Sequence, residues 1–309
     1  FLAYDGALGS NLYTVGRDGA HLCNLSYGLQ QDFEVYDWSP DGQWIVFSAV
    51  LTGRAQCAAG CSGEVYVVSI DGSELRRLTF GQNASHVLWS PDGAWLAVQV
   101  DGEVSGTRDL RLIAPDGSAE RTLLTAEDGL WLMRWSPDSR QIAVIVSEHS
   151  ESRFTHAVNV VDITSGEART VLESSWRQDS LAWSPDGLHL AVATYANARS
   201  QLVEVDVVSG AVEVLVDADT RGGAYSPDGA QLAFWRTDLG AARWLEVIDL
   251  ATREVMRVAT LLGVNGRGVS WVPEGDALLI SASGVMRVSV PDGALRSLFV
   301  GAHGSNWYP

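Results

Sequence analysis

The chain of 309 residues contains no lysine: all 21 of its basic residues are arginine, which we interpret as a genomic codon bias. Acidic residues number 38, so the formal net charge is −17. This balance argues against nucleic acid or an anionic membrane surface as a partner. No run of 18 or more apolar residues occurs, so we expect no membrane insertion by this segment.

Cysteine is also scarce, with three residues in all. Cys57 and Cys61 share one expected loop and lack both a second pair and a histidine at zinc spacing, so we expect no zinc site. Two interpretations of this pair stay open. It forms a small disulfide, which would suit an oxidising compartment, or it remains as two free thiols. We expect Cys23 to be a small buried hydrophobe.

The chain does contain a repeat, Trp-Ser-Pro-Asp-Gly, whose copies follow one another at intervals of 42 to 51 residues. Such a period, with short apolar segments between turn signals, is typical of a β-propeller with one four-stranded blade per repeat. We expect the motif aspartates to bond turn amides and not a ligand. The six copies start at Trp38, Trp89, Trp135, Trp183, Tyr225 and Trp271.

One repeat shows the strand pattern. Residues 86–89 form an expected strand A, and the motif turn follows it. The apolar run over residues 95–100 suits a strand B that is buried on both faces. Residues 109–114 and 120–124 supply strands C and D, with the hairpin signal Asp116-Gly117 between them.

Six complete sets of four strands are expected to begin near residues 33, 86, 131, 179, 221 and 267. Residues 1–26 supply three more strands and residues 303–309 a fourth, so we predict a seventh blade that is split between the two ends. Pairing of the last strand with the first ones would close the fold. We therefore predict a single all-β domain over residues 1–309, a seven-bladed propeller of four-stranded antiparallel blades. Because the chain begins at Phe1 and not Met, we expect a trimmed or mature fragment.

The repeats, together with the strand and turn over residues 65–72, resemble the TolB-like, WD-repeat-like bacterial β-propellers over essentially the whole chain. The resemblance implies the fold, and for TolB itself a partner-binding role in the periplasm. TolB itself looks like a six-bladed propeller with a second domain, whereas seven blades in a single domain are expected here. The role of TolB is therefore not carried over to this chain. Propellers of this type also precede the catalytic domain of prolyl-oligopeptidase-like enzymes, but no Gly-x-Ser-x-Gly nucleophile motif occurs here.

The strand order predicts that A–B and C–D turns lie on one face and that B–C and D–A loops, which are longer and more variable, lie on the other. Functional residues concentrate on such loops. Within the fourth blade we expect a B–C loop over residues 147–157, with His149 and His156 in solvent. One residue per blade, four positions before the motif aromatic, is expected to rim a central channel on the loop face: His303, Glu34, Ser85, Trp131, Asp179, Arg221 and Arg267.

Arg221 and Arg267 come from adjacent blades and are expected to clamp a carboxylate of a peptide or sugar acid, with Trp131 as a stacking surface. The alternative is that each arginine pairs with a carboxylate such as Asp179 or Asp219.

A second hypothesis assigns a metal to His86, His303 and Glu34, because some seven-bladed lyases of uronate oligosaccharides that look like this fold use a His-rich channel metal. The two histidines have opposite strand parity and lie two blades apart. This favours solvated or core histidines, so we expect no metal and no cofactor.

We therefore expect a non-catalytic, monomeric propeller that binds a protein or peptide at the channel mouth. It would work in the periplasm, outside the cell or as the ectodomain of a membrane-anchored bacterial protein. Two alternatives stay open: a polysaccharide-lyase- or hydrolase-like enzyme with its site at the same mouth, and a structural or sensor domain of a larger protein. The expected ligand-binding residues are Arg221, Arg267, Trp131, Asp179, Glu34, His303 and His86.

Overall fold

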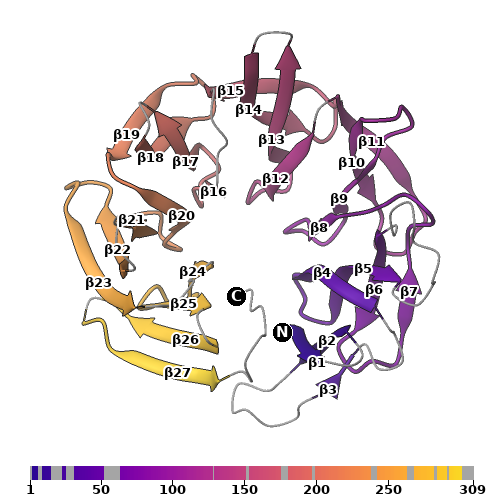
Figure 1. Ribbon diagram of the computed structural model, residues 1–309, viewed down its shortest axis with the longest axis horizontal. Helices are drawn as coiled ribbons and strands as arrows, with labels where there is room; N and C mark the ends of the chain where they lie inside the picture. Colours follow the sequence, from indigo (N-terminus) through magenta and orange to yellow (C-terminus); the bar gives the residue numbers. More distant parts are fainter. Residues whose placement is uncertain are drawn as a thin grey trace. The chain divides into compact units, whose positions relative to one another are not determined.

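The computed structural model shows strands, turns and bends, and the strands form seven antiparallel sheets, which fit seven propeller blades (Figure 1). Among the described residues there is no helix that could cross a membrane. The chain divides into two compact units, of which unit 1 holds Phe1–Leu130 and unit 2 most of the remainder. The structure describes residues 2–5, 9–14, 23–25, 31–51, 63–127, 129–150, 153–174, 180–196, 199–237, 242–262, 268–281, 284–290 and 292–300.

Unit 1 contains one three-stranded and two four-stranded sheets, and in each sheet the strands pair in chain order. The three-stranded sheet confirms the three strands expected at the N-terminal end. The strand expected from residues 303–309, and with it the closure of the fold, lies outside the described residues. The sheets are β1 (Leu2–Asp5), β2 (Gly9–Thr14) and β3 (Cys23–Asn24); β4 (Gln31–Trp38), β5 (Trp44–Leu51), β6 (Gly63–Ser69) and β7 (Leu75–Arg77); and β8 (His86–Trp89), β9 (Leu96–Asp101), β10 (Arg108–Ile113) and β11 (Glu120–Ala126).

Unit 2 contains four sheets of four strands, again paired in chain order. The first strand of each sheet lies on the inner side of the unit (Figure 1). The sheets are β12 (Leu130–Trp135), β13 (Gln141–Ser150), β14 (Arg153–Asp162) and β15 (Ala168–Ser174); β16 (Ser180–Trp183), β17 (His189–Ala196), β18 (Arg199–Asp206) and β19 (Val212–Val216); β20 (Thr220–Tyr225), β21 (Gln231–Thr237), β22 (Ala242–Asp249) and β23 (Val255–Leu262); and β24 (Val269–Trp271), β25 (Ala277–Ser281), β26 (Gly284–Ser289) and β27 (Leu295–Val300).

The motif copies that contain serine and aspartate form the same hydrogen-bonded turn. In the second copy, Ser90 Oγ donates to Asp92 Oδ1 at 2.6 Å and accepts from the backbone N of Trp95 at 2.9 Å. Asp92 Oδ1 also accepts from the backbone N of Ala94 at 3.0 Å, and Gly93 has φ +76°. The expected turn role of the aspartates is thereby confirmed. The same two bonds to a serine hydroxyl and a turn amide are made by Asp41, Asp138, Asp186 and Asp228.

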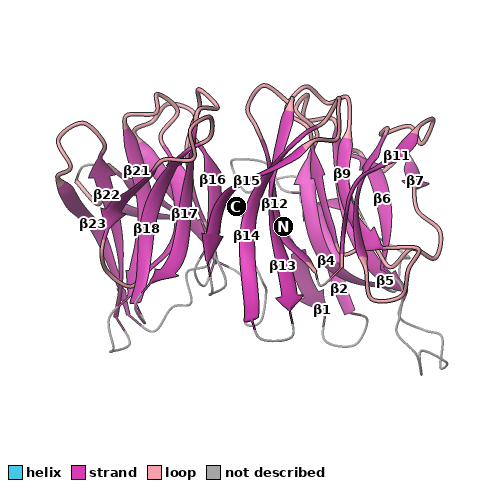
Figure 2. Cartoon of the chain, turned by 90° about the horizontal axis from the view of Figure 1, so that it is seen from above, coloured by secondary structure: helices cyan, strands magenta, loops and turns pink. Residues whose placement is uncertain are grey.

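Hydrogen bonds of this kind favour the ionised form of several turn carboxylates. The hydroxyl of Ser39 lowers the pKa of Asp41, and the serine hydroxyls do the same for Asp186 and Asp228. In a C–D turn, the hydroxyls of Ser69 and Ser73 lower the pKa of Asp71 to about 2. The tight turns therefore carry fixed negative charge, and Figure 2 shows them at one end of the strands in each unit.

Neighbouring sheets within a unit touch through their motif turns and share apolar cores. A Cβ added to Gly93 would lie 3.7 Å from the ring of Pro40, which belongs to the preceding turn, and Gly229 stands in the same relation to Pro185. Strand B is apolar and buried between two such cores, as expected, with Leu96 fully covered in β9. The indole of Trp271 adds a 2.9 Å bond to a carbonyl oxygen of the preceding sheet.

Strand D carries a register shift in five sheets, where one of its residues is skipped in the ladder with strand C. In β11 the skipped residue is Leu123, whose side chain is 7% exposed. A β-bulge of this kind bends a strand and turns a side chain inward, so each outermost strand curves against its sheet. The skipped residues are Leu123, Val171, Leu215, Val258 and Leu298.

Two expectations from the sequence are corrected here. The fourth-blade loop expected over residues 147–157 is mostly strand, because β13 runs to Ser150 and β14 begins at Arg153. His156 is not in solvent but 5% exposed within β14.

Cys23 lies half-buried in β3 beside the first apolar core, and its thiol is free. Cys57 and Cys61 lie outside the described residues.

Candidate functional site

Four of the seven expected site residues lie in described strands. Glu34 and His86 belong to unit 1, and Trp131 and Arg221 belong to unit 2. Asp179, Arg267 and His303 lie outside the described residues, so the expected clamp of two arginines stays a prediction. The first strand of a sheet positions each of the four described residues, as the spacing from the motif aromatic predicts.

Arg221 sits directly before a β-bulge in β20. Arg221 pairs with Trp235 of β21 and Ala224 pairs with Ala233, so two residues of β20 stand opposite Phe234 alone. Gly222, the first of them, has φ +69°, and a Cβ there would lie 3.4 Å from Trp235 Cδ1. The positive φ therefore favours glycine at this point. Bulges often lie next to functional sites, where they redirect a side chain, and this one directly follows Arg221.

The Arg221 side chain is exposed, and it forms no ion pair with any described residue. Asp219, one of the carboxylates considered as its partner, instead accepts a 3.2 Å bond from the backbone N of Ser200. Asp219 therefore does not prevent Arg221 from binding an external anion. A guanidinium that has no ion-pair partner among the described residues can receive a carboxylate in bidentate fashion.

Trp131, the second residue of β12, belongs to unit 2 and is 38% exposed, and a hydrogen bond to a buried serine holds its indole. Its indole Nε1 donates to Ser147 Oγ at 2.6 Å, and that oxygen lies 2.8 Å from His156 Nδ1. Ser147 and His156 face each other because they pair in the β13–β14 ladder. The bond to Ser147 engages the indole N–H of Trp131.

The Ser147–His156 pair contains the atoms of a hydrolytic dyad but not its accessibility. Ser147 is 1% exposed and its oxygen already accepts from the indole of Trp131. A nucleophilic hydroxyl must reach the substrate carbonyl, which this one cannot do. The chain of three groups instead orients Trp131.

In unit 1, Glu34 also lies at a register shift. Phe33 pairs with Ala49 and Val35 with Ser48, so Glu34 is the extra residue of β4. His86 opens β8 opposite Gln99 and is half-buried. Among the described residues no group of three His, Cys, Asp or Glu side chains could hold a metal. The expectation that His86, His303 and Glu34 hold no metal stays a prediction, because His303 lies outside the described residues.

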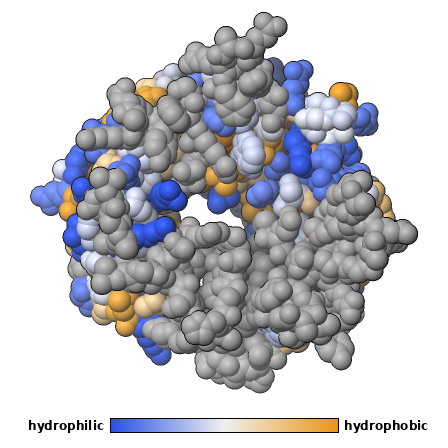
Figure 3. Space-filling view, in the orientation of Figure 1, coloured by the Kyte–Doolittle hydropathy of each residue, from blue (hydrophilic) through white to orange (hydrophobic). Residues whose placement is uncertain are grey.

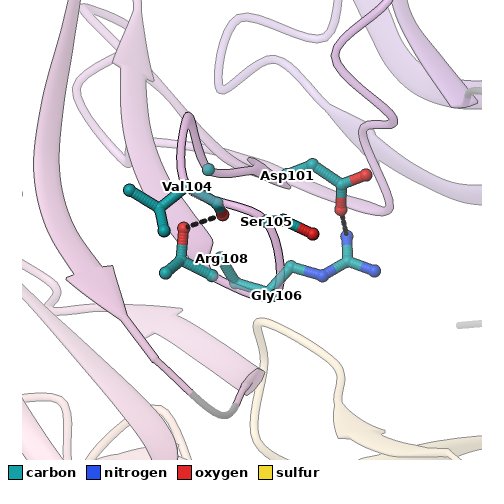
Figure 4. Close-up of a pocket in the computed structure, with 7 residues that line it drawn as sticks. Asp101, Val104, Ser105, Gly106 and Arg108 are labelled. Atoms are coloured by element: carbon teal, nitrogen blue, oxygen red, sulfur yellow. Dashed lines mark hydrogen bonds and ion pairs between the residues drawn. The ribbon is translucent and has the colours of Figure 1, made fainter.

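A surface pocket of about 350 Å³ lies in unit 1, in the loop between β9 and β10 (Figure 4). Asp101 and Arg108 form a 2.8 Å ion pair at its edge, and Thr107 Oγ1 donates to the carbonyl of Val104. Its lining includes none of the expected site residues. Its charged groups are already paired, so it does not change the assignment of the site.

The groups that support Trp131 and Arg221 were not predicted from the sequence. Ser147 and His156 were assigned to a loop, and only their register in the ladder brings them together. The Gly222-Gly223 pair is a signal that could have indicated the bulge, since glycine inside a strand often marks one.

Figure 3 shows hydrophobic residues scattered in small groups among hydrophilic ones over the described part of one face.

No family model matches the chain. Among curated proteins, the uncharacterized protein Atu1656 of Agrobacterium fabrum is 24% identical over 170 residues, which cover 52% of this chain and 54% of that protein. The Tol-Pal system protein TolB of Histophilus somni is 37% identical over 84 residues, 27% of this chain and 19% of that protein. The chain thus spans about half or less of the length of these relatives.

Solved structures align over most of the chain. A putative TolB from Agrobacterium tumefaciens has a TM-score of 0.60 at 21% identity and covers 88% of this chain and 97% of its own. An oligogalacturonate lyase in complex with manganese reaches 0.73 at 12%, over 97% and 86%. A puromycin hydrolase reaches 0.73 at 18%, over 99% and 52%. At these identities the likeness establishes the fold, which is that of the TolB-like β-propellers.

Proposed function

We propose that this chain is a non-catalytic binding scaffold that takes a protein or peptide partner at the inner strands of unit 2, on the side of the B–C and D–A loops. The observation that carries the proposal is the contrast between two side chains. Arg221 is exposed and without a counter-charge among the described residues. Trp131 is partly exposed and fixed by a hydrogen bond to the buried Ser147.

Tryptophan and arginine are the residues that most often dominate the binding energy of protein interfaces. Fixing the indole before binding reduces the entropy lost on association. Trp131 supplies a rigid apolar surface, while Arg221 supplies a charge-assisted hydrogen bond. A partner segment that fits both carries a carboxylate and, beside it, an apolar or aromatic group.

The net charge of the chain also bears on where an anionic partner can bind. With a net charge of −17, an anionic partner is repelled unless it meets a local positive group. Arg221 is such a group, and Arg267 of the next repeat is expected to be a second. We place the protein in the periplasm, outside the cell or in the ectodomain of an anchored protein, in keeping with the likeness to TolB.

A second candidate function is polysaccharide cleavage, favoured by the 0.73 TM-score to an oligogalacturonate lyase in complex with manganese. That lyase is in complex with manganese, and the candidate ligands here are His86, His303 and Glu34. The two candidates differ in a single assay. Incubation with oligogalacturonate, with and without manganese, produces an unsaturated uronate chromophore only if the chain is a lyase.

The binding proposal is tested with fluorescent peptides that end in an aromatic residue and differ only in a free or amidated C-terminus. We expect the free carboxylate to bind more tightly, and Arg221→Ala to remove that preference. Arg140→Ala, an exposed arginine in a motif turn, serves as the matched control. Equal binding of both peptides, or a preference that survives Arg221→Ala, would refute the assignment of Arg221.

A further inference from the structure

A second group of charged side chains gathers on one face of the sheet β20–β23 in unit 2. Arg236 of β21 pairs in register with Trp244 of β22, and Glu246, two residues further along β22, pairs with Arg257 of β23. Residues that face each other in register, or that are two apart in one strand, project from the same face of a sheet. Four side chains from three adjacent strands therefore form one cluster.

The two arginines share one carboxylate, but unequally. Arg257 donates from Nε and Nη2 to Glu246 Oε1, each at 3.2 Å. Arg236 Nη1 lies 3.6 Å from the other oxygen, Oε2, which is an ion-pair distance and not a hydrogen bond. Glu246 is 3% exposed, and within the described part of the chain Oε2 accepts no hydrogen bond.

The cationic groups face solvent, whereas the carboxylate does not. The side chains of Arg236 and Arg257 are 41% and 49% exposed, against 3% for Glu246. The guanidinium of Arg257 lies over the ring of Trp244, 4.3 Å from its centroid, and this contact holds its plane in place. An approaching ligand therefore meets two guanidinium groups, one of them stacked, above a buried counter-charge.

Further along the same face the sheet is apolar. Phe234, opposite Glu246, is fully buried in the core shared with the neighbouring sheet. Thr220, opposite Arg236, is 1% exposed, and its Oγ1 has no partner among the described residues. The cluster thus borders an apolar core on one side. Two buried oxygens, Glu246 Oε2 and Thr220 Oγ1, accept or donate no hydrogen bond among the described residues.

We propose that Arg236, Arg257 and Trp244 form a carboxylate-binding site separate from Trp131 and Arg221. Two guanidiniums and one carboxylate carry a net charge of +1, which a single carboxylate neutralises. A phosphate dianion would leave an excess negative charge in a chain that already carries −17. Planar forks of N–H donors match a carboxylate in geometry as well as in charge.

This site does not depend on the proposed function. Arg221 pairs with Trp235, which neighbours Arg236 in β21, so their side chains leave the sheet on opposite faces. A ligand at Arg221 is held by one face of the sheet and a ligand at Arg236 by the other. Failure of either proposal therefore leaves the other standing.

The test is an NMR titration of the full chain that follows the Nε–Hε signals of arginine and the indole N–H of Trp244. The probes are N-acetylglycine and glucuronate, and the neutral controls are N-acetylglycinamide and glucose. We expect saturable shifts at Arg257 and Trp244 with at least one acid and none with the neutral compounds. The acid that binds more tightly indicates whether the natural carboxylate belongs to a peptide end or to a sugar.

Arg236→Gln is the diagnostic variant, because Arg236 makes no hydrogen bond to Glu246 and its removal leaves the Arg257 contacts in place. We expect about a tenfold weaker affinity for the acid. Arg236→Lys keeps the charge but loses the fork, and should fall between Arg236→Gln and the natural chain. Arg253→Gln, which removes an exposed arginine paired with Glu213, should leave the affinity unchanged. Absence of saturable shifts with both acids, equal shifts with the neutral compounds, or unchanged affinity in Arg236→Gln would overturn the proposal.

Discussion

The indole Nε1 of Trp131 donates a 2.6 Å hydrogen bond to the hydroxyl of Ser147. This bond determines which way a partly exposed aromatic ring faces at the beginning of β12. It reaches further into the sheet, because the same hydroxyl lies 2.8 Å from His156 Nδ1. The orientation of a surface residue is thus maintained by two buried ones, and a change below the surface should be felt at the ligand.

Ser147→Ala should free Trp131 without touching any exposed atom. The substitution leaves the indole N–H and the imidazole Nδ1 without this hydroxyl, so we expect a loss of about 1–3 kcal/mol in the free energy of unfolding. Urea titration measures this loss, and acrylamide quenching reports the mobility of the ring. His156→Asn, which keeps a polar atom near the position of Nδ1, should cost less than His156→Leu. Equal costs for the two would show that His156 acts by volume alone.

Gly222→Ala should lower the stability of the protein and change the direction of the Arg221 side chain. Alanine at φ +69° is in the left-handed region, which costs about 1–2 kcal/mol, while its Cβ would be in contact with Trp235 at 3.4 Å. Gly223→Ala is the matched control, since a Cβ there meets only ordinary contacts at 3.9 Å. Thermal unfolding should separate the two variants. If Gly223→Ala proves as destabilising as Gly222→Ala, positive φ is not the cause.

Asp92→Ala should lower stability on the order of 1 kcal/mol through the loss of its turn bonds. The aspartate accepts from the Ser90 hydroxyl and from the amide of Ala94, both within the turn. Asp92→Asn retains an oxygen at the same place and should recover part of the loss in a chemical-denaturation assay. Peptide binding should be unchanged in both variants. A binding defect in a variant that is still folded would give the motif aspartate a role beyond its turn.

Stability should decline in acid, partly because of Asp71. Its folded-state pKa of about 2 lies below its ordinary value of 3.8, since Ser69 and Ser73 donate to the carboxylate. A depressed pKa adds stability above the ordinary value, and that contribution is lost as the pH falls from about 4 to about 2. The urea midpoint recorded between pH 6 and pH 2 should therefore fall less steeply in Asp71→Asn. Parallel profiles for the two proteins would contradict the assignment.

The seven sheets could be predicted from the sequence because their boundaries are local. A turn such as Ser90–Gly93 carries all its own hydrogen bonds within six residues, so each copy of the motif marks one hairpin wherever it occurs. Strand B could be predicted for a similar reason, since a short apolar run bounded by turns suits a strand with both faces buried.

The support of the candidate site could not be predicted, because it depends on register. Ser147 and His156 stand in a polar stretch that reads as a loop, and they meet only because β13 and β14 extend to either side of it. The cluster of Arg236, Glu246 and Arg257 joins three strands by pairings that no spacing in the sequence reveals. The bulge after Arg221 is an intermediate case, indicated by two glycines but not located by them.

The skipped residue in strand D bears on how copies of this protein behave when they are crowded together. A strand at the margin of a sheet, such as β11 or β19, presents unused amide and carbonyl groups that can recruit a strand of another molecule. The register shift beside Leu123 puts the two halves of β11 out of step with each other. A strand of another molecule that paired with one half of β11 would be out of register with the hydrogen-bonding groups of the other half. The repeat therefore carries, at the same point of five sheets, a built-in obstacle to edge-to-edge aggregation.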